Sequence, residues 1–267
     1  MAPSPKFIAI SAENLSGKAW LRSTNYAFAA GETLIPLVVS ELTQAVPAMP
    51  LGFVQSGPGF QLVAVTSPKQ GANLFVAPDG RWLGAYVPAA LRGYPFRLVK
   101  PQDRANSILC IDEASGLVVE AGQGETFFDE DDRPSKALKD VFEILSQVER
   151  SRVATQAAVD ALAAANLIQP WPMDIKQGEQ NIPVAGLYRI DEAALNALEN
   201  EAFLTLRRSG ALPAAYAQLL SMNQLALLRR LSQIQATLNA PPPSVEQKFA
   251  GLRGIGLSQD DGTLKFH

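Results

Sequence analysis

Hydrophobic positions in the first half of the chain follow a short-strand pattern. Brief apolar or alternating runs bounded by Gly, Pro, Asn or Asp are typical of β-strands. Such runs are FIAI (7–10), FQLVAVT (60–66), ANLFVAP (72–78), RWLGAYV (81–87), SILCID (107–112) and GLVVEA (116–121). The pattern predicts a β-rich segment over residues 1–128.

Turn residues suggest how these strands are joined. Asp79-Gly80 separates two of the runs and is a typical type I′ pair, so it predicts a β-hairpin. Ser115-Gly116 predicts a second hairpin in the same way. Within this half we also expect one short helix over residues 34–46, ended by Pro47 and Pro50.

The spacing of apolar residues changes after residue 128. One helical face is formed by Leu138, Val141, Phe142, Leu145 and Val148. Ser135 or Asp132 is placed to cap the start of this helix. The alanine-rich run 155–168 continues or restarts it.

Residues 170–190 then read as extended chain with a turn near Gly178. Asp191 is placed to cap a helix that runs to about Arg208, whose buried stripe is Leu195, Leu198, Ala202 and Leu206. Gly210 ends that helix, and a final helix is expected over residues 213–238.

Strands followed by helices favour an α+β fold in which the helical half packs against the β-rich half. We therefore predict one domain over residues 1–238, β-rich to residue 128 and mainly helical from residue 129. A proline-linked tail follows over residues 239–267, beginning with the spacer Pro241 to Pro243.

Composition narrows the functional classes. The net charge of −3 and the 18% of charged residues lack the basic stripe of a nucleic-acid-binding protein. The N-terminus has no apolar segment of the kind found in Sec signal peptides, and no run approaches the roughly 20 residues of a membrane span. We expect a cytoplasmic protein, with signal-independent export left open.

Histidine and cysteine counts restrict the chemistry further. The chain has one histidine, His267, and one cysteine, Cys110, in a strand-like run where a buried inert thiol is expected. Histidine-based triads and zinc sites are thereby excluded, as is an internal disulfide framework. We predict no catalytic residues, no metal and no cofactor, and leave open an enzyme with an unrecognised carboxylate or arginine site.

Phosphate-binding glycine loops and the GxSxG motif are also missing. The acidic run Asp129 to Asp132 lacks the ligand spacing of an EF-hand, and acids before a helix complement its dipole. We interpret that run as structural.

The main candidate binding segment, which combines two arginines with three aromatic residues, is YVPAALRGYPFRL, residues 86–98. Arginine offers a planar fork suited to a carboxylate, and aromatic rings offer flat apolar area. The candidate ligand-binding residues are Asn73, Trp82, Tyr86, Arg92, Tyr94 and Arg97. In the competing interpretation, Arg92 or Arg97 pairs with an acid such as Asp112 or Glu125 and only stabilises the fold. If one of the two arginines binds a ligand, we expect it to be Arg92.

Four segments also form a specific linear series. They are NLFVAPDGRWLGAYVPAALRGYPFRL (73–98), ILCIDEASGLVVEAGQGETFF (108–128), VAGLYRIDEAALNAL (184–198) and LRRSGALPAAYAQLLSMNQLALL (206–228). In this order they resemble the bacterial SapC family, named for a surface-layer-associated protein and distinct from the similarly named peptide-transport permease. The resemblance extends over residues 7–238.

The resemblance implies an accessory role. Members of that family tend to be encoded beside flavin-dependent halogenase-like and iron/2-oxoglutarate dioxygenase-like proteins. A non-catalytic protein that holds a peptide, an aromatic small molecule or such a partner enzyme is therefore the first hypothesis. A surface-layer or structural component is the alternative.

Overall fold

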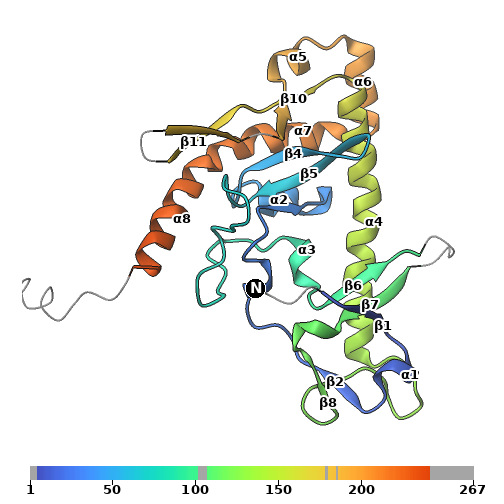
Figure 1. The fold of residues 1–267 in the computed structure, drawn as a ribbon. Coiled ribbons are helices and arrows are strands. Elements are labelled where there is room, and N and C mark those ends of the chain that lie inside the picture. Colours follow the sequence, from blue (N-terminus) through green and yellow to red (C-terminus); the bar gives the residue numbers. More distant parts are fainter. Residues whose placement is uncertain (1–4, 102–106, 178–179, 185, 241–267) are drawn as a thin grey trace, which may run out of the picture.

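The protein is described by a computed structural model that covers residues 5–101, 107–177, 180–184 and 186–240. Its largest sheet has five antiparallel strands in the order β10-β13-β4-β5-β3. The strands are β3 (Leu34–Pro36), β4 (Leu51–Ser56), β5 (Gly59–Val65), β10 (Ile168–Pro170) and β13 (Leu187–Ile190). Strands from both halves of the chain thus share one sheet (Figure 1).

Two small sheets lie at the other end of the molecule (Figure 1). One contains β1 (Phe7–Ala9), β7 (Ile108–Asp112) and β6 (Phe96–Val99) in that order. The second contains β8 (Val118–Glu120), β2 (Lys18–Trp20) and β9 (Glu125–Thr126). A separate two-stranded ribbon joins β11 (Met173–Gln177) to β12 (Gln180–Val184).

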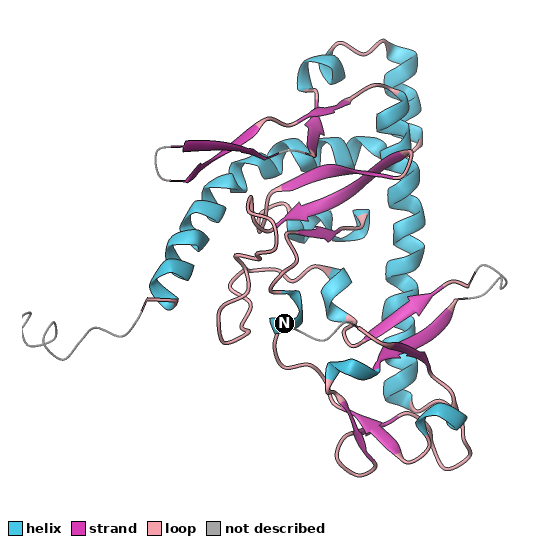
Figure 2. Cartoon of the chain, in the orientation of Figure 1, coloured by secondary structure: helices cyan, strands magenta, loops and turns pink. Residues whose placement is uncertain are grey.

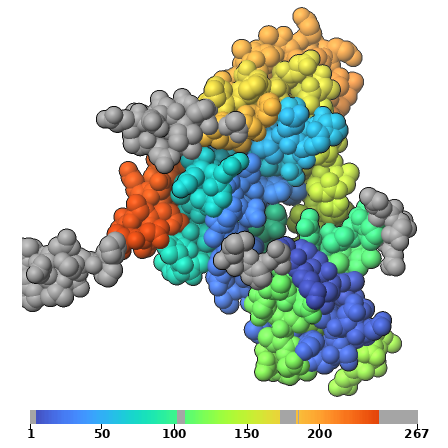
Figure 3. Space-filling model, viewed as in Figure 1, coloured from blue at the N-terminus to red at the C-terminus, as the bar shows by residue number. Residues whose placement is uncertain are grey.

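The helix α4 (Lys136–Ala164) runs the length of the molecule and connects its two ends (Figure 1). Ser135 caps it, its hydroxyl accepting the N–H of Leu138 at 3.2 Å. The other helices are α1 (Ala12–Leu15), α2 (Leu42–Ala45), α3 (Ala89–Arg92), α5 (Glu192–Asn196), α6 (Asn200–Arg208), α7 (Ala211–Ser221) and α8 (Leu225–Leu238). Residues 7–20 and 107–128 gather at one end, and the segments around α5 and α6 lie at the other (Figure 3).

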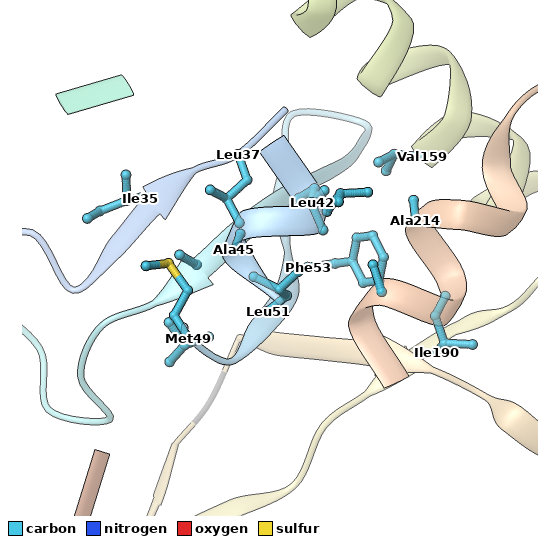
Figure 4. Packing of buried hydrophobic residues seen from close by; sticks show 14 of the residues in the cluster. Ile35, Leu37, Leu42, Ala45, Met49, Leu51, Phe53, Val159, Ile190 and Ala214 are labelled. Atoms are coloured by element: carbon cyan, nitrogen blue, oxygen red, sulfur yellow. The ribbon is translucent and has the colours of Figure 1, made fainter. Parts of the chain in front are cut away.

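Two hydrophobic clusters follow from this arrangement. The larger one joins the five-stranded sheet to α2, α4 and α7, with Ile35, Phe53 and Ala214 among its members (Figure 4). The smaller one contains Leu15, Trp20, Phe96, Ile111, Phe127 and Leu138. Helix α4 contributes Val159 to the first cluster and Leu138 to the second, so it holds the two together.

The α+β prediction is confirmed, because sheets dominate the first half and helices the second. The cap at Ser135 is confirmed, and the alanine-rich run continues the same helix. The hydroxyl-bearing cap and the steady apolar period explain why this long helix was predictable. The turn expected near Gly178 and the tail from residue 241 lie outside the described residues.

Several local predictions are wrong. The runs at 72–78 and 81–87 form loop with one isolated bridge, Val76 to Trp82 (Figure 2). The chain does reverse at Asp79-Gly80, but only Gly80 has a positive φ, so the turn is not type I′. The predicted hairpin at Ser115-Gly116 is absent, since β7 pairs with β1 and β6 whereas β8 pairs with β2.

Three predicted helices also differ from the structure. Residues 34–46 begin as strand β3 and continue as a short 3₁₀ turn, Val39–Glu41, before α2. The helix capped by Asp191 is interrupted between α5 and α6, and the final helix is divided into α7 and α8 by a 3₁₀ turn at Met222–Gln224. In these last two helices the predicted continuity is wrong. The apolar period holds over residues 195–206, whereas Tyr216 and Leu220 of α7 are exposed.

Candidate functional site

A pocket of about 240 Å³ opens where the two hydrophobic clusters meet. Three stretches line it: residues 20–28, residues 91–96 between α3 and β6, and one face of α4 at Val141 and Ile144. Gly93 allows the second stretch to approach α4, because a Cβ there would lie 2.5 Å from Cδ2 of Leu145.

Aromatic side chains form much of the pocket wall. Phe28 and Tyr94 are stacked, with ring centroids 3.8 Å apart and planes 9° from parallel. Trp20 and Phe96 meet edge to face at 4.7 Å. These paired contacts restrict the rings, so the wall is largely formed before any ligand arrives.

Arg92, in the last turn of α3, places an exposed guanidinium at this pocket. Its Nη2 donates to the hydroxyl oxygen of Tyr86 at 2.5 Å, and its Cζ lies 5.2 Å from the Tyr86 ring centroid. The Tyr86 hydroxyl in turn donates to Oε2 of Glu41 at 2.7 Å. Arg92 is therefore oriented by a tyrosine and, through it, by a carboxylate.

Glu41 is buried, with 5% of its surface exposed, and it organises this region. Its Oε1 accepts the N–H of Val38 at 2.8 Å, and its Oε2 accepts the N–H of Ala89 at 2.8 Å as well as the Tyr86 hydroxyl. Three donors and no acceptor match an ionised carboxylate, which can only accept. Burial, and secondly the bond to Glu41, raises the pKa of Tyr86.

Arg22 is the second arginine at the pocket, and its charge is balanced. Its Nε and Nη2 donate to the two carboxylate oxygens of Glu125 at 2.5 and 3.0 Å. This bidentate pair raises the pKa of Arg22. Among the ion pairs of the described residues none involves Arg92.

Trp20 adds an unpaired donor. The residue is 2% exposed and lines the pocket, and its indole N–H has no hydrogen-bond partner among the described residues. A buried indole N–H usually has an acceptor. Among the described residues, the pocket thus has one guanidinium without a carboxylate partner, and one of its lining residues, Trp20, has a buried indole N–H without an acceptor.

The predicted site residues fall into three groups. Arg92 and Tyr94 line the pocket. Tyr86 and Trp82 lie directly behind it: Tyr86 orients Arg92, while Trp82 packs against the lining residue Tyr26 at 5.6 Å and donates its indole N–H to the Tyr86 carbonyl at 2.8 Å.

The other two predicted residues lie apart from the pocket lining. Asn73 is buried, and its amide donates to the Ala29 carbonyl at 3.0 Å and accepts the Phe75 N–H at 3.0 Å, which stabilises a loop. Arg97 is exposed on β6, with its Cζ 5.7 Å from the Phe7 ring centroid.

Within the described residues, the ion pairs expected of Arg92 or Arg97 with Asp112 or Glu125 are not formed, because other groups occupy both acids. Asp112 accepts the backbone N–H groups of Lys6 at 2.8 Å and Ala114 at 3.1 Å, and Glu125 is taken by Arg22.

Sequence reasoning missed half of the pocket. Trp20, Arg22, Tyr26 and Phe28 come from the stretch AWLRSTNYAF (19–28), which has the same mixture of aromatic rings and arginine as residues 86–98. That shared composition could have indicated that residues 19–28 belong to the same candidate site. Glu41 was also missed, although an acid inside the apolar stretch VVSEL is a sign of a buried polar role.

Two further expectations concern residues outside the pocket. In the acidic run, Asp129 Oδ1 accepts the N–H groups of Asp131 and Arg133 at 3.0 and 2.9 Å, which closes a turn before α4. No group of three potential metal-ligating side chains occurs among the described residues. Cys110 is buried as predicted, and burial raises the pKa of its thiol.

Comparison with known proteins gives one match. A protein-family model with the description SapC matches residues 11–228, about four fifths of the chain. No curated protein and no solved structure matches. Within the described residues, no helix combines the length and apolar character needed to cross a membrane.

Proposed function

Because the chain belongs to the SapC family, we propose that it is a binding and accessory protein of that family, with its ligand site in the pocket between the two hydrophobic clusters. The observation that carries the proposal is Arg92. Its guanidinium is exposed at an aromatic pocket, is oriented by Tyr86, and has no carboxylate partner in the described part of the chain.

The contrast with Arg22 supports a binding role for Arg92. Both arginines line the same pocket, yet Glu125 takes two N–H groups of Arg22. Arg22 is thus already neutralised by an acid of the fold. Arg92 is instead held in place by a neutral hydroxyl, which leaves its charge for another partner.

The site can be tested by nuclear magnetic resonance on the indole N–H signals of the three tryptophans. We would add mixtures of aromatic acids, neutral aromatics and aromatic amines at millimolar concentration. The signal of Trp20, assigned with Trp20→Phe, should move, while that of Trp171, which is 5% exposed and belongs to the larger cluster, should not.

Arg92→Ala should reduce these shifts. Arg81→Ala is the matched control, since Arg81 is exposed, pairs with Asp79 at 2.6 Å and does not line the pocket. The absence of any Trp20 response to all three classes of fragment would refute the proposed site.

The accessory part of the proposal concerns a partner enzyme. We propose that the ligand is presented to a modifying enzyme of the flavin-dependent halogenase-like or iron/2-oxoglutarate dioxygenase-like type, as the family resemblance implies. Sedimentation of the full chain mixed with each purified enzyme from the same organism tests this. A complex is expected with at least one of them, and two mixtures that sediment as separate components would remove the accessory role.

A further inference from the structure

We infer that the pocket recognises an aromatic carboxylate: one aromatic ring system joined through a short link to a carboxylate. This inference rests on the proposed binding function and specifies its ligand. The shared chemistry occurs in two sources, a free aromatic acid and an aromatic residue at the C-terminus of a peptide.

The size of the pocket limits the ligand to one ring system. Its volume is about 240 Å³. A cavity of about 150 Å³ lined by apolar side chains holds one benzene molecule, whereas pockets for drug-sized ligands begin at about 300 Å³. The space fits a ring with a short substituent, and a second ring would remain outside.

The wall favours an aromatic ring. Phe28 and Tyr94 already stack on each other at 3.8 Å, so the ligand ring would meet their edges and outer surfaces. On the α4 side, Val141 and Ile144 provide aliphatic contacts. Offset and edge contacts of this kind are the preferred geometries between aromatic groups.

The available donors favour an anion. Of the five N–H groups of a guanidinium, the described residues take one from Arg92, through the Tyr86 hydroxyl. A cationic ligand would be repelled by Arg92, and a neutral ligand would leave its planar fork unpaired, whereas a carboxylate matches that fork.

The surrounding charges favour a monoanion over a dianion. Arg22 is already paired with Glu125, so Arg92 is the one lining cation that no described acid pairs with. Glu41 lies beyond the Tyr86 hydroxyl, where its own oxygens accept from Val38, Ala89 and Tyr86. A phosphate monoester would bring a second negative charge, and the described lining residues provide no second unpaired cation to offset it.

The test compares acids with their neutral amides at the Trp20 indole signal. The free-acid probes are 3-phenylpropionate and 3-phenylpropanamide, and the peptide-end probes are N-acetylphenylalanine and its amide. Each acid should bind about tenfold or more tightly than its amide, because a hydrogen bond to a charged group contributes about that much. Phenyl phosphate should bind no better than 3-phenylpropionate.

Variants assign this preference to Arg92. Arg92→Gln should abolish the difference between acid and amide, and Arg92→Lys, which keeps the charge without the fork, should retain part of it. Arg81→Gln should leave the difference unchanged. Unaltered indole signals of Trp82 and Trp171 in each unliganded variant would show that the fold is preserved.

The outcomes distinguish the carboxylate preference from the binding function. Equal binding of acids and amides, or tighter binding of phenyl phosphate, would overturn the inference and leave the binding function standing. No response of Trp20 to any probe or fragment would overturn both. If the carboxylate preference holds, stronger binding of 3-phenylpropionate identifies a free acid as the source, and stronger binding of N-acetylphenylalanine identifies a peptide end.

Discussion

Replacing Glu41 by alanine should destabilise the protein more than any other single change around the pocket. The buried carboxylate is the acceptor for the N–H groups of Val38 and Ala89 and for the Tyr86 hydroxyl. Val38 is 6% exposed and Ala89 8% exposed, so water reaches neither freely. Both N–H groups would lose their acceptor.

The cost follows from counting these groups. A buried donor left without a partner costs about 1–3 kcal/mol. If two backbone donors and one hydroxyl all stayed unpaired, the summed cost would exceed that of a single donor several-fold. Because the space left by the side chain admits water, we expect a loss in the free energy of unfolding of about 3–4 kcal/mol. Glu41→Gln should cost about 2–3 kcal/mol, since its amide NH₂ would face one of the N–H donors.

Urea unfolding followed by circular dichroism measures these losses at neutral pH. Tyr86→Phe removes one donor to Glu41 and should cost only about 1–2 kcal/mol. Glu143→Ala, at an exposed position of α4, is the control and should stay within about 0.5 kcal/mol of the original chain. A loss below about 1 kcal/mol for Glu41→Ala, or a larger loss for Tyr86→Phe, would refute the reasoning.

Three further predictions concern neighbouring groups. Burial raises the folded-state pKa of Tyr94 above its unfolded-state pKa of about 10. The neutral Tyr94 side chain therefore contributes its full stability below that unfolded-state pKa, and this contribution is lost as pH rises through the folded-state pKa. Tyr94→Phe should flatten the decline in urea midpoint above about pH 10. Gly93→Ala should lower stability by about 1–3 kcal/mol in thermal unfolding because a Cβ would collide with Leu145, whereas Gly31→Ala, with open space around it, should not. Cys110 should react slowly with a disulfide reagent in the native protein and rapidly in urea, since it is 8% exposed and burial raises its pKa; fast native labelling would contradict this.

Periodicity was enough to predict the fold class and the long helix, because both depend on local pattern. The loop at residues 66–88 shows where pattern fails. Residues 72–78 have the composition of a strand, but the Gln235 side chain of α8 donates to the carbonyls of Leu74 and Val76 at 3.1 and 2.6 Å. A side chain distant in sequence therefore satisfies backbone groups that a strand partner would otherwise take.

Strand pairing failed for a related reason. β7 and β8 are separated by a few residues, yet β7 pairs with β1 and β8 with β2. Each partner lies about a hundred residues away along the chain. A turn signal reports local geometry, and it cannot show that more distant strands provide better-matched partners.

The same difference between local sequence pattern and contacts distant in sequence applies to the candidate site. The sequence identified Arg92 and Tyr94 by composition, but the pocket exists because residues 20–28 and α4 fold against them. Whether an arginine is paired within the fold depends on which acids lie nearby. Glu125 was a plausible partner for Arg92 in sequence terms, and the fold places it against Arg22 instead.

The Glu41–Tyr86–Arg92 chain of hydrogen bonds has a consequence that stability measurements alone would not reveal. Glu41 orients Arg92 through the Tyr86 hydroxyl without pairing with it directly, so the guanidinium is fixed in direction while its charge remains available. Tyr86→Phe keeps that charge and removes the hydrogen bond that holds it. We therefore expect Tyr86→Phe to weaken 3-phenylpropionate binding several-fold, since a flexible arginine must be ordered on binding at about 0.5–1.5 kcal/mol. Binding of 3-phenylpropanamide should hardly change. Equal weakening of acid and amide would instead indicate that Tyr86 merely shapes the pocket.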